Sequence, residues 1–295
     1  MIIDYVYENW QLLENKKIKE LNNAIDIQHK AIQLIAVAGK YLVAEEPNDE
    51  HITMQWIPKR NLLVGRLIQA NPVICFGLDV INFDLVLFNE GIEALSVFNL
   101  HNRSREEAFE WMKNQIGKFE LDRNQLRKSM HYTIESFEPA SEQIFISPNY
   151  SSTLEWCKYK TNANILFGFL SEDYEYASEI RIWPHHYNTG VNIPLTFDEK
   201  GEILKSISIG LAIPDHLFNE PYFYINHFNN KDKLDYNHLK KFLFAGNWVI
   251  NGWKGAVLKS TDITKKNTIE TQVNISITFF KEAIKETLKL INYKG

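Results

Sequence analysis

The sequence predicts an α+β protein, because its strand-like and helix-like stretches are segregated instead of alternating one by one. Strand-like runs occur in clusters with short turn signals between them, which is typical of antiparallel meanders with packed helices. Helical periodicity is confined to separate stretches around these clusters. The two halves therefore share a similar plan, although no residue-level repeat shows that they arose by duplication.

The composition of the 295-residue chain is that of a folded globular protein, with 45% hydrophobic and 23% charged residues. The net charge of −5 and the lack of a long Lys/Arg run argue against nucleic acid and anionic membranes as partners. No apolar run is long enough to span a bilayer, and the first residues lack the pattern of a signal peptide. We therefore expect a cytoplasmic protein with no membrane partner. The sequence leaves its oligomeric state open.

The chain has two cysteines, Cys75 and Cys157, which are too few for a disulfide framework or a zinc ribbon. Both lie among apolar neighbours without a basic motif nearby, so we expect buried, unreactive thiols. No P-loop, G-x-G-x-x-G or G-x-S-x-G motif occurs, and no cofactor is predicted.

The first half opens with a predicted helix over residues 8–38, where apolar residues recur at steps of three, four or seven. We expect Gly39 to end this helix and His29 to lie on its surface. After the turn Pro47-Asn48-Asp49, short strands are predicted over 51–57, 61–68, 73–79 and 83–88.

A capping box opens the next predicted helix, since the Ser104 hydroxyl can accept from the first turn while Glu107 reaches back. This helix is predicted to run to about residue 116, and a shorter one covers 122–130. The connector over 135–150 is acidic and contains Pro and Ser, so it is the predicted domain boundary. The predicted domains are 1–135 and 150–295, which could also form one continuous domain.

The second half begins with a predicted helix and then places several strands before a closing helix. Its predicted elements are a helix over 151–168, strands over 178–187, 206–213 and 222–228, a short helix over 238–244, an extended stretch over 253–258 and a helix over 273–291.

The predicted strand over 178–187 carries the densest group of chemically versatile side chains in the chain. Because side chains alternate across a strand, the apolar residues share one face with His186, and polar and aromatic residues share the other. That second face resembles the lining of a ligand cleft and consists of Arg181, Trp183, His185 and Tyr187. The alternative is a pair of ordinary histidines near a strand end, one of them hydrogen-bonded in the core.

The predicted strand over 206–213 has one face made only of small residues, Ser206, Ser208, Gly210 and Ala212. A face without bulky side chains lets another group come close, and that group could be a helix or a ligand. If this strand neighbours the aromatic one, its small face could form the floor of a pocket.

Further polar residues gather near the ends of the later strands, where functional groups often collect. Asp215 or Glu220 could fix the tautomer of His185, which makes these three the candidate catalytic residues. No metal site is predicted, and a three-histidine zinc site would need the fold to bring together His185, His216 and His227. The candidate ligand-binding residues are Arg181, Trp183, His185, Tyr187, His216, Tyr222, Tyr224 and Trp248, with His131 as a further contributor.

Several motifs follow one another along the chain. They are Trp183-Pro184-His185-His186-Tyr187, Ser208-Ile209-Gly210-Leu211, Glu220-Pro221-Tyr222-Phe223-Tyr224 and Gly252-Trp253-Lys254-Gly255-Ala256-Val257-Leu258, preceded by His131-Tyr132 and the capped helix at Ser104. In this order they resemble a family of uncharacterised bacterial proteins of unknown function, over roughly residues 50–258. The resemblance implies a shared fold and site region but no activity.

The chain departs from the family pattern where acid–base or metal chemistry would need particular groups. Asn188 stands where the family has an aspartate, and Thr133 stands where it has a glutamate. Asn247 and Val249 flank Trp248 at positions where the family has histidines. These departures favour a protein that binds a ligand over one that catalyses a reaction.

The leading hypothesis is therefore an uncharacterised protein that binds a small polar ligand in a His/Trp/Tyr-lined pocket of the second half, without intact catalytic machinery. The first alternative is a metal-assisted or acid–base, hydrolase-like enzyme that uses His185 with Asp215 or Glu220. The second alternative is a structural or protein-interaction role, in which these side chains form a core.

Overall fold

A computed structural model of the chain describes residues 3–134, 144–230, 234–236, 239 and 243–293. Helices and antiparallel sheets are both present, which confirms the predicted α+β class. The chain forms two compact units, each assembled from more than one stretch of sequence. We call them the meander unit, residues 19–157 and 181–187, and the terminal unit, residues 1–18, 158–180 and 188–295.

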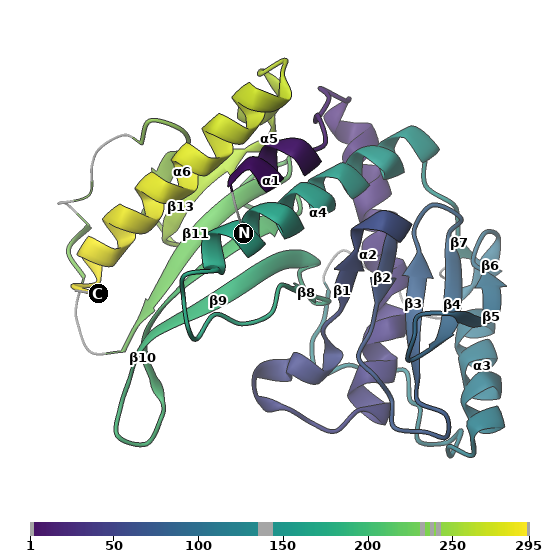
Figure 1. Ribbon diagram of the computed structural model, residues 1–295. Helices are drawn as coiled ribbons and strands as arrows, with labels where there is room; N and C mark the ends of the chain where they lie inside the picture. The colour runs from purple at the N-terminus through teal and green to yellow at the C-terminus, as the bar shows by residue number, and fades with distance from the viewer. Residues whose placement is uncertain (1–2, 135–143, 231–233, 237–238, 240–242, 294–295) are drawn as a thin grey trace. The chain divides into compact units, whose positions relative to one another are not determined.

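The meander unit is built on an antiparallel sheet whose strands pair in the order of the sequence, as Figure 1 shows. The short turns between the strand-like runs predict this arrangement. β3 and β4 are buried along most of their length, in keeping with their continuous apolar sequences. The strands are β1 (Gln55–Ile57), β2 (Leu62–Val64), β3 (Ile74–Asp79), β4 (Asp84–Asn89) and β5 (Ala94–Asn99), and a separate small sheet pairs β6 (Arg103–Ser104) with β7 (Ile144–Phe145).

The helix α3 (Arg105–Ile116) covers one face of this sheet. It begins with the predicted capping box: Glu107 N donates to Ser104 Oγ at 3.1 Å, and Ser104 N donates to the Glu107 carboxylate at 2.8 Å. The Trp111 ring packs edge-on against Phe76 of β3, with 6.1 Å between the ring centroids. The capping box thus sets where the helix starts, and the aromatic contact attaches it to the sheet.

The helix α2 (Ile18–Leu42) runs past Gly39, so the prediction that this glycine ends the helix is wrong. A Cβ on Gly39 would lie 2.6 Å from the carbonyl oxygen of His51 and 2.9 Å from the Cα of Ile52. The glycine therefore lets the helix pack against the backbone of the 3-10 helix η1 (Pro47–Ile52).

The terminal unit contains the chain's long antiparallel strands, in the spatial order β12-β13-β11-β10-β9. Helices cover one of its faces (Figure 1): Phe167 of α4 meets Phe223 of β11 and Phe280 of α6, with ring centroids 5.9 and 5.7 Å apart. These rings form the centre of an apolar layer between sheet and helices. The elements are α4 (Tyr150–Ser171), β9 (Asn188–Phe197), β10 (Ile203–Ala212), β11 (Tyr222–Asn229), β12 (Asn247–Val249), β13 (Gly255–Lys259), α5 (Ser260–Thr264) and α6 (Ile269–Leu290).

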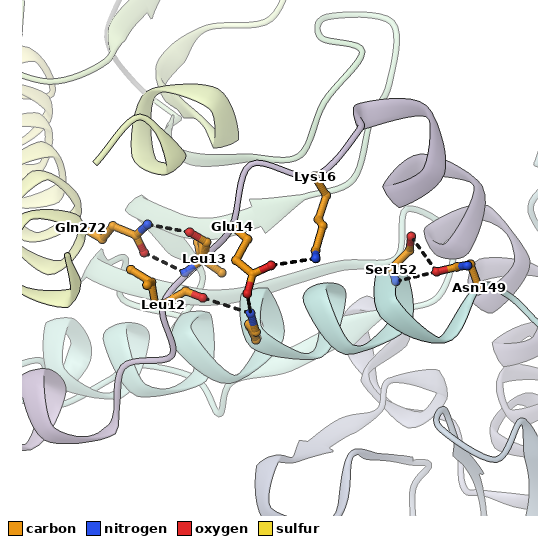
Figure 2. A network of polar contacts seen from close by, with 8 residues as sticks. Leu12, Leu13, Glu14, Lys16, Asn149, Ser152 and Gln272 are labelled. Carbon is orange, nitrogen blue, oxygen red and sulfur yellow. Dashed lines mark hydrogen bonds and ion pairs between the residues drawn. The ribbon is translucent and has the colours of Figure 1, made fainter. Parts of the chain in front are cut away.

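The segment after α1 (Ile3–Asn9) is attached to α6 by the fully buried side chain of Gln272. Its amide oxygen accepts from Trp10 Nε1 at 3.3 Å and from Leu13 N at 2.9 Å, and its nitrogen donates to Leu13 O at 2.8 Å. Figure 2 shows the Leu13 contacts, with Glu14 and Lys16 forming an ion pair nearby. The Gln272 side chain thus satisfies backbone N–H and C=O groups of Leu13 that a helix would bond within itself.

This attachment explains why the predicted helix over 8–38 is wrong at its start. Residues 10–17 lie outside both α1 and α2. Besides the Leu13 contacts, Gln11 N donates to Asn162 Oδ1 and Asn162 Nδ2 donates to Gln11 O, each at 2.8 Å. Bonds to residues far away in the sequence replace the local ones of a helix in this segment.

One other predicted element is absent from the structure, and several strands were not predicted. Residues 122–130 do not form a helix, because the Asp122 carboxylate accepts from Asn124 N at 2.9 Å and stabilises a turn. Strands β5, β9 and β12 were not predicted; β5 has mixed exposure, β12 is short, and β9 begins directly after the strand that was predicted over 178–187. The predicted helix over 238–244 and the connector over 135–150 lie largely outside the described residues.

Candidate functional site

The Trp-Pro-His-His-Tyr motif is a turn and not the end of a long strand. β8 (Arg181–Trp183) is only three residues long, and its Ile182 exchanges backbone hydrogen bonds with Met54 at 2.8 and 3.0 Å. Residues 184–187 then turn away. The prediction that His185 and His186 lie on opposite faces is therefore wrong, since their ring centroids are 4.4 Å apart.

The turn is held by polar side chains of α2 within the meander unit. The carbonyl oxygen of Pro184 lies 2.8 Å from both His29 Nε2 and Gln33 Nε2. The Tyr187 hydroxyl donates to Gln28 Oε1, also at 2.8 Å. The expectation that His29 is a surface residue is wrong, because the polar side of α2 packs on this turn and buries the imidazole.

Two of the predicted ligand-binding residues are buried in the support of this turn. Tyr187 is fully buried and stacks on the His29 ring at 5.6 Å between centroids. Its burial raises the pKa of the phenol well above the ordinary value. Arg181 is 8% exposed and forms an ion pair with Glu50. Both side chains fix the motif in place, and neither faces solvent.

Trp183 and His185 are partly exposed and His186 is exposed, and this group meets residues from two further segments. The Tyr132 ring lies 5.7 Å from that of His185 and 5.2 Å from that of His131, centroid to centroid. His131 Nε2 lies 2.8 Å from Asp49 Oδ2. Trp183 packs edge-on to His185 at 6.2 Å. We call this group the histidine cluster: Asp49, His131, Tyr132, Trp183, His185 and His186.

The surroundings of His185 favour its neutral imidazole form. Burial, and then the neighbouring His186, lower the pKa of His185 to about 4. His185 is therefore neutral at pH 7 and offers one N–H donor and one nitrogen acceptor. Burial, and then the charge of Asp49, raise the pKa of Tyr132, whose hydroxyl donates to Gln33 Oε1 at 2.8 Å.

Asp49 reaches the cluster from a strained backbone. Asn48 and Asp49 have φ values of 57° and 60°, the left-handed region that costs energy for residues other than glycine. Such strain is often found at functional sites. Sequence reasoning missed Asp49, since the Pro47-Asn48-Asp49 stretch was interpreted only as a turn; a turn that favours left-handed Asn and Asp was the available signal.

The predicted carboxylates of the terminal unit are used in local structure. Asp215 accepts from the backbone N–H groups of Leu217 and Phe218 and from the Tyr222 hydroxyl, at 2.8, 3.2 and 2.7 Å. Glu220 accepts from Ser260 Oγ at 2.8 Å and from the Thr261 N–H at 2.7 Å. Asp215 thus shapes its loop, and Glu220 holds the first turn of α5.

The small-residue face of β10 is covered by an aromatic ring of its own sheet. A Cβ on Gly210 would lie 2.4 Å from the ring carbon Cζ of Tyr224. Asn188 Nδ2 donates to the Tyr224 hydroxyl at 2.9 Å.

The remaining candidate residues of the terminal unit lie apart from this face. His227 Nε2 lies 2.9 Å from the Tyr236 hydroxyl. His216 is exposed and Trp248 is half-buried on β12.

The structure groups the predicted site residues by unit. Trp183, His185 and the contributor His131 come together in the meander unit. Asp215 and Tyr222 come together in the terminal unit, where their side chains share a hydrogen bond. Within the described residues, no three His, Cys, Asp or Glu side chains are arranged to hold a metal ion.

Other predicted features of the chain are settled more simply. Both cysteines are buried, as predicted, and burial raises the pKa of the Cys75 thiol to about 11. None of the helices in the described part of the chain combines the length and apolar character needed to cross a bilayer.

A hollow of about 430 Å³ in the terminal unit contains none of the predicted site residues. It is lined by Leu234, Asp235, Leu239, Glu286, Lys289, Leu290 and Asn292.

Comparison with protein-family models, with curated proteins and with solved structures finds no match to this chain. The resemblance to a family of uncharacterised bacterial proteins therefore stays a prediction that rests on the motifs alone.

Proposed function

We propose that the protein binds a small polar ligand at the histidine cluster. The observation that carries this proposal is the meeting of partly exposed rings with a carboxylate–imidazole pair. The rings of Trp183 and Tyr132 flank His185, while Asp49 lies 2.8 Å from His131. Aromatic faces bind the flat or apolar side of a ligand, and the carboxylate and neutral imidazole bind its hydroxyl or amino groups.

The support beneath the cluster is consistent with a pre-organised binding site. The Pro184 carbonyl accepts from two side chains of α2, so the turn that presents His185 is fixed. Asp49 is held in a left-handed conformation. Rigid support lowers the entropy cost of binding, because fewer side chains must be ordered when the ligand arrives. The chemistry favours a small uncharged or cationic molecule with several hydroxyl or amino groups.

The test is thermal stabilisation of the purified protein by three probes: glucose, adenosine and free lysine. At least one probe should raise the melting temperature in a concentration-dependent way, because a ligand that binds only the folded state stabilises it. The shift should disappear in His185→Gln and Trp183→Leu. It should persist in His101→Gln, which changes an exposed histidine outside the cluster. No shift with any probe, or a shift unchanged in the cluster variants, would contradict the proposal.

The Asp49–His131 pair favours acid–base catalysis as a second candidate function. With its proton on Nε2 facing Asp49, His131 presents Nδ1 as a base. Two further variants, with the same His101→Gln control, test this second function. Hydrolysis of p-nitrophenyl acetate that falls at least about tenfold in His131→Gln and in Asp49→Asn, but not in His101→Gln, would identify the enzyme.

Two broader expectations belong to this proposal. The order of the motifs supports membership in the family of uncharacterised bacterial proteins, and the composition supports a cytoplasmic location.

A further inference from the structure

The loop between β12 and β13 contains the only Asn-Gly pair of the sequence, Asn251-Gly252. The two strands pair up to Val249 and Gly255, and the residues between these positions belong to no helix or strand. Asn251 and Gly252 are both exposed. A side-chain amide and the backbone nitrogen of a glycine therefore lie next to each other in contact with water.

The structure leaves the backbone nitrogen of Gly252 open to reaction. Gly252 has a φ of 78°, and apart from its two neighbours in the chain no atom lies within 4 Å of the position that a Cβ would take. Glycine has no side chain that could shield this nitrogen. Among the described residues, neither the Asn251 side chain nor the Gly252 N–H has a hydrogen-bond partner. The nitrogen is thus free to approach the side-chain amide of Asn251.

Two other exposed asparagines show how the structure protects such a side chain. Asn102 and Asn292 have left-handed φ values of 58° and 52°. The N–H that follows Asn102 donates to Leu100 O at 3.0 Å. The N–H that follows Asn292 donates to Leu288 O at 2.9 Å. A nitrogen held by a hydrogen bond, and next to a bulky side chain, does not turn toward the preceding amide, so Asn251 is the reactive one of the three.

We propose that Asn251 is a site of self-modification, where asparagine converts without an enzyme to aspartate and isoaspartate. Asparagine is among the thermolabile residues of proteins. The Gly252 nitrogen gives up its proton and attacks Cγ of Asn251, and the new C–N bond closes a cyclic imide. The C–N bond of the side-chain amide breaks, and the amide leaves as ammonia with that proton. Water then opens the imide: attack at Cγ gives aspartate, and attack at the main-chain carbonyl carbon gives isoaspartate.

Either product changes the loop in a way that persists. Both add a negative charge close to Lys254, whose ammonium lies 4.5 Å from the centroid of the Tyr236 ring. Isoaspartate also adds a methylene group to the backbone, because the chain then passes through Cγ. The charge of the protein and the path of this loop therefore come to depend on the age of the molecule.

The test is peptide mass spectrometry of the folded full chain after incubation at mildly alkaline pH, with digestion at acidic pH to prevent further reaction. The Asn251 amide should be lost before any other, and labelling by protein isoaspartate methyltransferase should detect isoaspartate in the same peptide. The loss should become faster as the pH rises, because the attacking nitrogen must give up its proton. Asn102 and Asn292 should keep their amides over the same period.

Gly252→Ala should slow the loss of the Asn251 amide several-fold, because its methyl group hinders the attack, and an unchanged rate overturns the cyclic-imide route. Melting temperatures check that this variant is folded. A second comparison needs no variant: the unmodified chain is incubated folded and unfolded in urea. If only the unfolded chain loses the Asn251 amide, the fold prevents the attack and the proposal is overturned. So does earlier loss at Asn102 or Asn292. These results are independent of ligand binding at the histidine cluster.

Discussion

Asp49 and His185 illustrate how individual residues acquire their chemistry from neighbours far away in sequence. Asp49 has a left-handed backbone and lies 2.8 Å from His131, a residue 82 positions later. The surrounding side chains shield His185 from water, and its pKa falls to about 4 because burial disfavours the charged imidazolium. These environments, more than the residue types alone, make the cluster a candidate site.

The low pKa of His185 predicts a pH dependence of stability. In the unfolded chain this histidine has its ordinary pKa of about 6.5. Between pH 6.5 and about 4, the unfolded chain takes up a proton that the folded protein does not, so the free energy of unfolding decreases as the pH falls. The stabilisation is complete above pH 6.5. His185→Gln should therefore lose less stability than the unmodified protein between pH 7 and pH 4, measured by urea unfolding.

A second buried histidine also contributes to the pH dependence of stability. Burial also lowers the pKa of His227, which contributes to the pH dependence of both proteins and cancels in their difference. If the free energy of unfolding falls equally with pH in the two proteins, His185 has the same pKa in the folded and unfolded states, which contradicts the prediction.

Helix α2 shows how an element can combine an apolar stripe with a functional polar side. Its apolar periodicity is visible in the sequence and correctly predicts a helix over most of its length. Its buried Gln28, His29 and Gln33 bind the turn of the His-His motif. Gly39 near its end permits close contact with the backbone of η1, the segment that carries Asp49. One helix thus supports two sides of the histidine cluster.

Gly39→Ala should destabilise the protein by about 1–3 kcal/mol, because the new methyl group would lie too close to the backbone of His51 and Ile52. Alanine is the better helix former by about 1 kcal/mol, but that gain is smaller than the steric cost. Asn23→Ala, at an exposed position of the same helix, should change the free energy of unfolding by less than about 0.5 kcal/mol. Urea unfolding of both variants measures this difference, and a stable Gly39→Ala protein would show that η1 can move away.

At the scale of the whole molecule, each compact unit is completed by segments that are distant in sequence. The meander unit includes residues 181–187, and the terminal unit includes residues 1–18. The first of these additions brings His185 to Tyr132, with Trp183 packed edge-on to His185. The second is fixed by Gln272, which bonds both backbone groups of Leu13. Such long-range closures make the fold cooperative, because losing one exposes buried polar groups elsewhere.

Gln272→Ala should cost about 3 kcal/mol of stability, because it leaves the N–H and C=O groups of Leu13 without their partner in a buried position. Asn274 provides a matched control on the same helix. It accepts one exposed hydrogen bond, from the Tyr7 hydroxyl at 2.7 Å, so Asn274→Ala should cost less than about 1 kcal/mol. Equal losses in the two variants, measured by urea unfolding, would mean that the N-terminal segment is not fixed by Gln272.

The sequence by itself determined those features that depend on residues close together in the chain. The capping box at Ser104 and Glu107 is a contact over three positions, and it forms as predicted. The meander of β1 to β4 and the closing helix α6 follow from local turn signals and from apolar periodicity. The burial of Cys75 follows from its apolar neighbours.

Only the tertiary structure decided the contacts between distant segments. Pro184 ends β8 because its carbonyl is bonded by α2, and residues 10–17 leave the helix because Asn162 and Gln272 bond their backbone. Asp49 and Tyr132 join the histidine cluster through contacts with His131 and His185, which lie far from at least one of them in the sequence. Local propensities amount to tenths of a kcal/mol per residue, whereas satisfying a buried polar group is worth several times more, so distant partners decide these positions.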